Sequence, residues 1–268
     1  MPPIIFDLLR KSTIIEQDPK SNPIWSGDYK NWEEAQALCI GYDSDIILEK
    51  CKSALLKVKN GEAVYERDSV IFDQIYYSFG LLAGLERAAL ENSGELTVLD
   101  FGGSLGSSYF QNKEFLKTCN KLNWCIVEQT HFVDCGKQYF EDGNLKFFHS
   151  IQDCLTIFKP NVLLISGVLQ YLDKPYELLT NFLALNIPYI IIDRTAFVNS
   201  NQDILTIQNV PDDIYKESYP AWFFAKNKFE ALVLNNYKLI SYFDSGFTPP
   251  TQINGKDKVY WNGLILKK

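Results

Sequence analysis

The stretch ELTVLDFGGSLG, residues 95–106, decides the fold of this chain. Its first half is a short apolar run and its second half contains three glycines, so it predicts a buried strand followed by a tight turn. Glycine lets the backbone turn sharply and lets a ligand approach main-chain amides without a Cβ in the way. A strand that ends in such a turn is typical of nucleotide-like ligand sites in open parallel sheets.

Downstream of this stretch, short apolar runs alternate with helical segments. Runs of this kind are typical of parallel strands that are buried on both faces. Two later runs have no helix between them, which indicates an antiparallel hairpin at the edge of the sheet. The predicted fold class is therefore α/β, a doubly wound, mostly parallel sheet of seven strands with an antiparallel C-terminal hairpin. We predict these strands over residues 96–101, 124–128, 146–148, 162–166, 189–193, 238–244 and 259–266, with a helix over 225–235 before the hairpin.

Upstream of residue 95 the sequence has a different character. Residues 32–59 carry apolar side chains at mixed helical spacings and predict helices and loops. Residues 69–92 place apolar side chains at steps of three and four, which predicts one helix that Ser93 and Gly94 end. We therefore expect a mainly helical or irregular N-terminal extension over residues 1–68, serving as a lid or as a wall of the acceptor site, and the α/β domain over residues 69–268.

The bulk composition excludes several classes of function. With 46% hydrophobic and 22% charged residues, the chain is typical of a soluble globular protein. The net charge is -7 and the longest basic run is the Lys267-Lys268 pair, so we expect neither nucleic acid nor an anionic membrane as a partner. No apolar stretch approaches the length of a transmembrane segment. Six cysteines without a C-x-x-C pair favour reduced thiols and a cytoplasmic protein. The sequence is compatible with an oligomer.

Two acidic residues narrow the choice of ligand. Asp100 ends the first predicted strand just before the glycines, and Glu128 ends the second one, 28 residues later. A carboxylate at the tip of the second strand can accept hydrogen bonds from both ribose hydroxyls. A carboxylate inside a glycine turn repels a pyrophosphate but suits a ligand that carries an ammonium and a sulfonium. Ser104 and Gly106 also break the G-x-G-x-x-G spacing of dinucleotide sites, so this region argues against NAD.

These residues resemble the motifs of a known family. The pattern Asp100-x-Gly102-x-Ser104-x-Gly106, followed by Glu128, is similar to the first two motifs of class I methyltransferases, although that family usually has glycine where Ser104 stands. FFHSI (147–151) and SGVLQYLDKPYELL (166–179) continue the likeness. A narrower resemblance is to a bacterial methyltransferase family associated with surface-polysaccharide biosynthesis genes. It is carried by WSGDYKNWEEA (25–35), YERDSVIF (65–72), WCIVEQTHFVDCGKQYF (124–140) and IIIDRTAF (190–197).

The resemblance implies a class I methyltransferase fold and S-adenosylmethionine as the cofactor. It also implies that Asp100 acts on the ammonium of the cofactor, directly or through water, and that Glu128 holds the ribose. The other cofactor-binding positions that it implies are Phe101, Gly102, Gly103, Ser104 and Gly106 around the methionine part, Gln129, His149 and Ser150 around the adenine, and Ser166, Gly167 and Val168 beside the sulfonium.

The catalytic residues are less distinctive. Methyl transfer from a sulfonium is an in-line displacement, and alignment of the reactants supplies much of the acceleration. A sugar hydroxyl would still benefit from a base, and the candidates near the predicted strand ends are Gln170, Tyr171, Asp193 and Arg194. Asp193 suits a proton acceptor, and Arg194 suits a phosphate or carboxylate of the acceptor, while a structural ion pair or helix cap is an alternative for each. No metal is expected, because the two histidines lack the spacing of metal ligands.

Two aromatic segments, residues 65–68 and 219–224, are candidate walls of an acceptor cleft, with core packing as the alternative. Three functions stay open on the sequence. The first is an S-adenosylmethionine-dependent methyltransferase that acts on a small-molecule or saccharide acceptor, such as a sugar-nucleotide hydroxyl in polysaccharide biosynthesis. The second is a nicotinamide-dependent epimerase or dehydrogenase of the same fold. The third is a non-catalytic protein of this fold that binds the cofactor.

Overall fold

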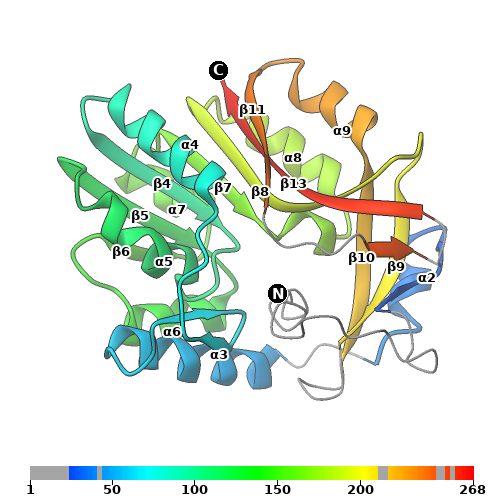
Figure 1. The fold of residues 1–268 in the computed structure, drawn as a ribbon, viewed down its shortest axis with the longest axis horizontal. Helices are drawn as coiled ribbons and strands as arrows, with labels where there is room; N and C mark the ends of the chain where they lie inside the picture. The colour runs from blue at the N-terminus through cyan, green and yellow to red at the C-terminus, as the bar shows by residue number, and fades with distance from the viewer. Residues whose placement is uncertain (1–23, 41–43, 211–216, 246–250, 254–256) are drawn as a thin grey trace.

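The predicted seven-stranded sheet is present in the computed structural model, which describes residues 24–40, 44–210, 217–245, 251–253 and 257–268 (Figure 1). The strand order is β6-β5-β4-β7-β8-β13-β11. The first five strands are parallel, and β13 is antiparallel to both β8 and β11. This confirms the α/β fold class with its antiparallel C-terminal hairpin. The bounds are β4 (Glu95–Phe101), β5 (Lys121–Val127), β6 (Leu145–Phe148), β7 (Val162–Ser166), β8 (Tyr189–Val198), β11 (Lys238–Asp244) and β13 (Asp257–Lys267).

Helices cover both faces of this sheet. One face packs against α4 (Phe79–Leu90), α5 (Ser107–Leu116) and α6 (Thr130–Tyr139), and the other packs against α7 (Ile151–Ile157), α8 (Pro175–Ala184) and α9 (Lys226–Val233). Consecutive strand residues alternate between the two cores. In β4, Val98 packs into the first core and Leu99 into the second. Because both faces are buried, the strands read as continuous apolar runs, which is what made them predictable.

Beyond β8 the sheet continues into strands that the sequence analysis did not predict. β9 (Ile204–Asn209) pairs antiparallel with β10 (Ser218–Ala225), and β10 pairs in parallel with the end of β8. β1 (Trp25–Ser26) pairs with β9, and β12 (Thr251–Ile253) pairs with β13. The aromatic segment 219–224 is therefore strand β10. Phe223 and Phe224 are fully buried in it, so they do not form an exposed wall of a cleft.

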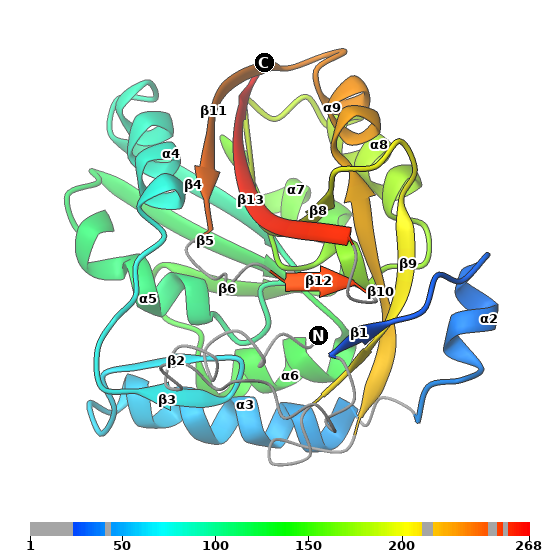
Figure 2. The same ribbon diagram turned by 45° about the vertical axis from the view of Figure 1, so that its right-hand side comes forward.

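The N-terminal part contains helices, as predicted, and also a β-hairpin. The helices are α2 (Trp32–Gln36) and α3 (Ser44–Lys59). The hairpin is β2 (Tyr65–Arg67) with β3 (Val70–Phe72), and it lies beside α3 in Figure 2. The single helix predicted over residues 69–92 is wrong over residues 69–78, because residues 70–72 pair with β2 and α4 begins only at Phe79. Its predicted end is confirmed, since Gly94 has a φ of 80° and its N–H donates to Ala89 O at 2.8 Å.

The expected division of the chain between residues 68 and 69 falls in the turn of this hairpin. Asp68 and Ser69 form the turn, with φ values of 54° and 71°. Residues 1–23 of the expected extension lie outside the described residues. Within the described part, α3 contacts α5 and α6, and β2 contacts α5. The hairpin is thus packed directly on the helices of the α/β sheet.

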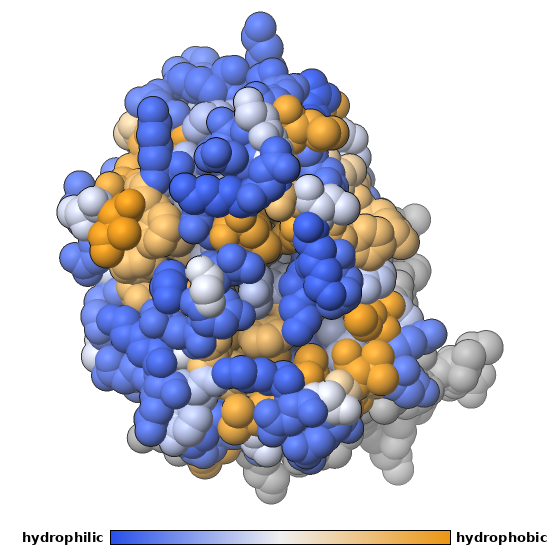
Figure 3. Space-filling view, turned by 90° about the vertical axis from the view of Figure 1, so that its left-hand side faces the viewer, coloured by the Kyte–Doolittle hydropathy of each residue, from blue (hydrophilic) through white to orange (hydrophobic). Residues whose placement is uncertain are grey.

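No helix in the described ranges is long and apolar enough to cross a membrane. Some large apolar side chains are nevertheless exposed, including Phe79 at 69% and Leu90 at 77%. On the face of the molecule shown in Figure 3, hydrophobic residues form separate patches between hydrophilic ones.

Candidate functional site

The candidate site lies where the parallel strands β4 to β8 end at one edge of the sheet. Parallel strands present their carboxyl ends at the same edge, and open α/β sheets bind ligands there. The ladders end level with one another: Phe101 pairs with Val127, Val127 with Phe148, and Ser166 with Asp193. The turn after β4 therefore lies next to Glu128 after β5, and the residues that follow β6 and β7 lie along the same edge.

Asp100 lies beneath the glycine turn. It is 1% exposed, and its Oδ2 accepts a hydrogen bond of 2.9 Å from Trp124 Nε1 of the neighbouring strand. A Cβ added to Gly103 would lie 2.5 Å from Asp100 Oδ2, so glycine is needed for this close approach. Burial raises the pKa of Asp100 to about 7. The carboxyl group thus lies against the turn at Gly103.

The turn itself has an unusual backbone. Gly102, Ser104 and Gly106 have φ values of 71°, 53° and 107°, all in the left-handed region. The Gly102 N–H donates to Val127 O at 2.9 Å, which ties the turn to β5, and Gly106 precedes the first turn of α5. Ser104 therefore adopts a conformation that glycine adopts more easily. Phe101 is different, because its ring packs edge-on against Phe182 of α8 at 4.9 Å and is thus part of the core.

Glu128 lies beside this turn, at the end of β5. Its Oε2 accepts a hydrogen bond of 2.6 Å from the N–H of Gln129, the residue that precedes α6. Burial raises the pKa of Glu128, and the backbone of Ser104 opposes part of that effect by lowering it, so the two predicted motifs are near each other. Asp100 and Glu128 are close enough to interact electrostatically, each disfavouring the ionised form of the other.

His149 and Ser150 follow β6, farther along the edge. The His149 side chain is 42% exposed, and its Nε2 lies 3.7 Å from Asp134 Oδ1. It lines a cavity of about 500 Å³ together with Phe148 and Phe158. The Ser150 hydroxyl accepts a hydrogen bond of 3.1 Å from Asp153 N and so caps α7. His149 therefore borders an open, partly apolar cavity at the last strand of the sheet, whereas Ser150 is the cap of α7 and is not part of the cavity lining.

Ser166 and Gly167 end β7 and contact a partly buried ion pair. Arg194 Nε donates to Ser166 Oγ at 3.1 Å, and Arg194 Nη1 lies 3.3 Å from Asp68 Oδ2 of the β2–β3 turn. A Cβ added to Gly167, whose φ is 69°, would lie 3.1 Å from Arg194 Nη2. Val168 is buried at 2% exposure and packs in the core. This ion pair joins the N-terminal hairpin to the central strands.

Asp193 and Arg194 lie within β8 and not at its end, which corrects the predicted strand boundary at residue 193. The parallel ladder with β7 stops at Asp193, but β8 continues to Val198 along β13. Arg194 has a φ of 50°, and the register with β13 shifts between Asn262 and Leu264, so the strand is irregular here. Asp193 is 2% exposed, and burial raises its pKa. The irregular backbone at Arg194 places the side chains of Asp193 and Arg194 at the site, although β8 continues to Val198.

Gln170 and Tyr171 belong to a short 3-10 helix, η1 (Leu169–Tyr171), which follows the turn after β7. Gln170 is 1% exposed, and its Nε2 donates to Arg194 O at 3.2 Å. The Tyr171 hydroxyl donates to Gln208 Oε1 of β9 at 2.9 Å. Burial raises the pKa of Tyr171, so the phenol stays protonated at neutral pH. The structure thus brings all four candidate catalytic residues to the region around Arg194.

The sequence placed residues 65–68 at a candidate acceptor cleft but assigned Glu66 and Arg67 no individual role, and the hairpin brings both to the site. Both are buried, at 2% and 5% exposure. The Ser107 hydroxyl at the start of α5 donates to Glu66, and Arg67 Nη1 donates to Ser108 Oγ at 3.3 Å. Burial raises the pKa of Glu66 to about 7. The adjacent charges in YERD were a signal, because charged residues between aromatic ones seldom lie in a hairpin core unless they are paired.

Carboxyl groups outnumber guanidinium groups among these site residues. Arg67 interacts electrostatically with Glu66, Asp100 and Asp193, and Arg194 interacts with Asp100 and Asp193. These residues therefore have a deficit of positive charge, and burial raises the pKa values of Glu66, Asp100, Glu128 and Asp193. The carboxyl groups are Glu66, Asp68, Asp100, Glu128 and Asp193, and the guanidinium groups are Arg67 and Arg194.

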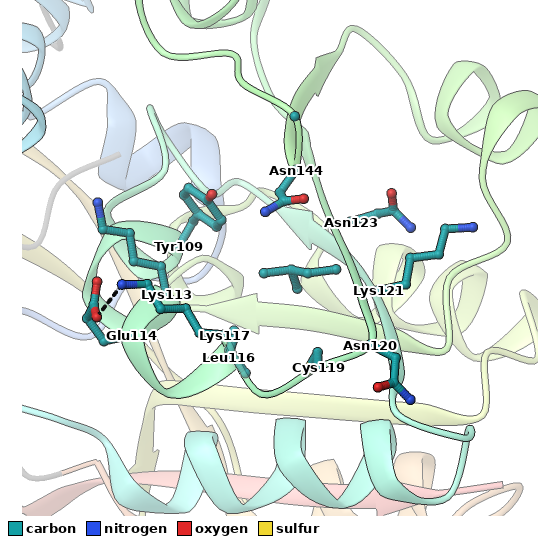
Figure 4. Close-up of a pocket in the computed structure, with 12 residues that line it drawn as sticks. Tyr109, Lys113, Glu114, Leu116, Lys117, Cys119, Asn120, Lys121, Asn123 and Asn144 are labelled. Carbon is teal, nitrogen blue, oxygen red and sulfur yellow. Dashed lines mark hydrogen bonds and ion pairs between the residues drawn. The ribbon is translucent and has the colours of Figure 1, made fainter.

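A second cavity, of about 630 Å³, lies at the opposite edge of the sheet and contains no predicted site residue. It is lined by residues at the start of β5 and by the end of α5 (Figure 4). Lys117 forms an ion pair with Glu114 there, at 2.6 Å. Among the residues that the structure describes, no group of three or more His, Cys, Asp or Glu side chains is arranged to hold a metal ion.

No protein-family model and no curated protein sequence matches this chain. Several solved structures are similar to it at low identity. The N-terminal domain of EvdMO1 with SAH bound matches with a TM-score of 0.45 and 12% identity, over 84% of this chain and 97% of that one. Magnesium protoporphyrin IX methyltransferase from Synechocystis PCC 6803 with bound SAM matches with a TM-score of 0.45 and 11% identity, over 85% and 99%.

Human N-acetylserotonin methyltransferase in complex with SAM matches with a TM-score of 0.44 and 11% identity, over 69% of this chain. The match spans about half of the human protein, 51% of its length.

Proposed function

We propose that this chain is an S-adenosylmethionine-dependent methyltransferase and that it methylates a hydroxyl of a saccharide or sugar nucleotide. The observation that carries the first part is the excess of buried carboxyl groups around the glycine turn. Glu66 and Asp100 each have a pKa raised to about 7, and Glu128 lies beside them. A ligand that carries an ammonium and a sulfonium would compensate these charges, whereas a pyrophosphate would be repelled.

The residues at the edge of the sheet fit such a cofactor. Gly103 and Ser104 would lie along its methionine part, with Asp100 acting through the turn because its carboxyl group is 1% exposed. Glu128 would hold the ribose, and the cavity beside His149 and Phe148 would take the adenine. When bound, the cofactor would supply an electrophilic methyl group on a sulfonium sulfur. The strand order and the left-handed glycine turn support this assignment, since this edge of an open parallel sheet is where nucleotide-like ligands bind.

The chain's own residues would orient the acceptor and accept its proton. Asp193 is buried next to Ser166, with Ser166 Oγ 3.4 Å from Asp193 Oδ2, and its raised pKa makes it a better base than an exposed aspartate. Arg194, held by Asp68 and Ser166, would fix the geometry around that carboxylate. The β2–β3 hairpin, whose first strand belongs to the expected N-terminal extension, would form a wall of the acceptor site, because Asp68 reaches Arg194 from its turn.

Transfer of a labelled methyl group tests the catalytic part of the proposal. The purified protein would be incubated with S-adenosylmethionine labelled in its methyl group and with one source of acceptors. One reaction would contain a cell-envelope extract, and a second would contain a set of nucleotide sugars. We expect base-stable label in a saccharide fraction, as an ether methyl group, and its loss with Asp193→Asn. Binding of the cofactor without transfer to any acceptor would instead support a non-catalytic protein of this fold.

A further inference from the structure

Two buried glutamine side chains near the proposed site each have an amide atom without a hydrogen-bond partner. Gln170 on η1 is 1% exposed and Gln208 on β9 is 0% exposed, and the unpaired atoms are Gln170 Oε1 and Gln208 Nε2. The other end of each amide is anchored, Gln170 Nε2 to Arg194 O and Gln208 Oε1 to the Tyr171 hydroxyl. Buried polar atoms in native proteins nearly always have partners, so each unpaired one requires an explanation.

The two amides belong to one cluster. Tyr171 links them, since its hydroxyl donates to Gln208 Oε1 at 2.9 Å and Tyr171 is the neighbour of Gln170 on η1. Gln170 and Tyr171 lie on η1, shortly after the turn at Gly167, while Gln208 comes from β9, one of the strands that extend the sheet beyond β8. The cluster therefore lies between the end of β7 and the added strands β9 and β10, next to Arg194.

The unpaired atoms are one acceptor and one donor of hydrogen bonds. An alcohol hydroxyl can donate to Gln170 Oε1 and accept from Gln208 Nε2, whereas a carboxylate can only accept and an ammonium can only donate. The ring of Tyr171 packs edge-on against Tyr219 of β10 at 5.5 Å, which fixes the position of the Tyr171 hydroxyl beside Gln208. The chemistry of the cluster thus matches a polyhydroxylated ligand.

We propose that Gln170, Tyr171 and Gln208 form a hydroxyl-binding subsite for the methyl acceptor, and that this subsite selects a neutral saccharide ring over an amine or a carboxylate. This proposal rests on the methyltransferase function proposed above. Gln208 is a specificity residue in it, supplied by β9, and Tyr171 is a positioning residue. The Tyr171 phenol donates to Gln208 Oε1, which leaves the Gln208 N–H₂ as the group that would donate to the ligand.

The variants Gln208→Met and Gln170→Met test the subsite, because methionine has nearly the length and volume of glutamine but no amide. Thr206→Val is the matched control. Thr206 is also fully buried on β9, two residues from Gln208, but its hydroxyl is already bonded to Ala221 O at 2.9 Å. The probes are the methyl glycosides of glucose, galactose, mannose, rhamnose and fucose, measured by ligand-observed NMR with the protein saturated with S-adenosylhomocysteine. Calorimetry measures the affinity for S-adenosylhomocysteine in each variant.

We expect the wild type and Thr206→Val to bind at least one glycoside, and both glutamine variants to bind it about fivefold or more weakly, as for a lost hydrogen bond. The affinity for S-adenosylhomocysteine should stay the same in all four proteins. The proposal is wrong if the wild type with S-adenosylhomocysteine binds none of the glycosides, or if Gln208→Met binds them as the wild type does. It is also wrong if Gln208→Met melts well below Thr206→Val, because the amide would then be structural. Failure of the wild type to bind S-adenosylhomocysteine would instead contradict the proposed function itself.

Discussion

At the scale of single residues, Asp100 and Glu128 make the sharpest prediction. Asp100→Asn and Glu128→Gln should each weaken S-adenosylmethionine binding about tenfold. The first removes a negative charge that the ammonium of the cofactor would compensate, and the second removes a charge-assisted hydrogen bond to the ribose. Isothermal calorimetry measures the effect. Glu114→Gln is the control, since Glu114 is an exposed carboxylate on α5 paired with Lys117. Unchanged affinity in a folded Glu128→Gln protein would remove the ribose assignment.

Gly103 makes a steric prediction at the same scale. Gly103→Ala should abolish measurable cofactor binding, because the new Cβ would lie 2.5 Å from Asp100 Oδ2 and would displace either the carboxylate or the turn. Gly143→Ala is the matched control, since a Cβ there would have no heavy atom within 4 Å. Thermal shift with and without S-adenosylmethionine separates loss of binding from loss of folding. A cofactor-induced shift in Gly103→Ala equal to that of the wild type would show that the turn tolerates the methyl group.

At the scale of secondary-structure elements, the sequence predicted best what depends on local pattern. The buried strands β4 to β8 were predictable because two packed cores require continuous apolar runs. The glycine turn was predictable because left-handed φ values favour glycine, and only Ser104 departs from that rule. The site residues at the ends of β4, β5 and β7 follow from the topology once those strands are assigned.

The elements that the sequence did not reveal depend on long-range pairing. Val70, Ile71 and Phe72 fit a helical spacing together with α4, but they pair with β2 instead. The end of β8 was missed because Arg194 interrupts its regular conformation with a φ of 50° while the pairing with β13 continues. β9 pairs with β10, and β10 also pairs with the end of β8. The sequence of either segment alone does not predict which strand it pairs with. Gln208 was therefore not predicted as part of a site.

At the scale of the whole molecule, the clustered carboxyl groups predict a dependence on pH. The folded-state pKa values of Asp100 and Glu66 are raised to about 7, well above the value of about 4 in an unfolded chain. Between these two pKa values the folded protein binds more protons than the unfolded chain does. Its stability therefore falls as the pH rises. These groups stabilise the cofactor-free protein below about pH 4. We expect the free energy of unfolding to decrease from pH 4 to pH 7 as that stabilising contribution is lost, and to show no further change from these groups above pH 7.

Cofactor binding should show the opposite trend. A cationic ligand binds the ionised carboxyl groups, so the affinity for S-adenosylmethionine should decrease below pH 7, by up to about tenfold per pH unit for each carboxyl that must lose its proton. Calorimetry between pH 5.5 and 8 measures this. Asp100→Asn provides the comparison and should flatten both pH profiles. A wild-type affinity that does not change over this range would contradict the charge argument.

The central claim is that this edge of the sheet binds a cationic nucleoside cofactor and not a dinucleotide, and one measurement tests it most directly. Isothermal titration calorimetry of the purified wild-type protein at pH 7.5 compares S-adenosylmethionine, S-adenosylhomocysteine and NAD. We predict saturable one-site binding of S-adenosylmethionine and S-adenosylhomocysteine, and no detectable heat with NAD. Tight binding of NAD without binding of S-adenosylmethionine would contradict the account.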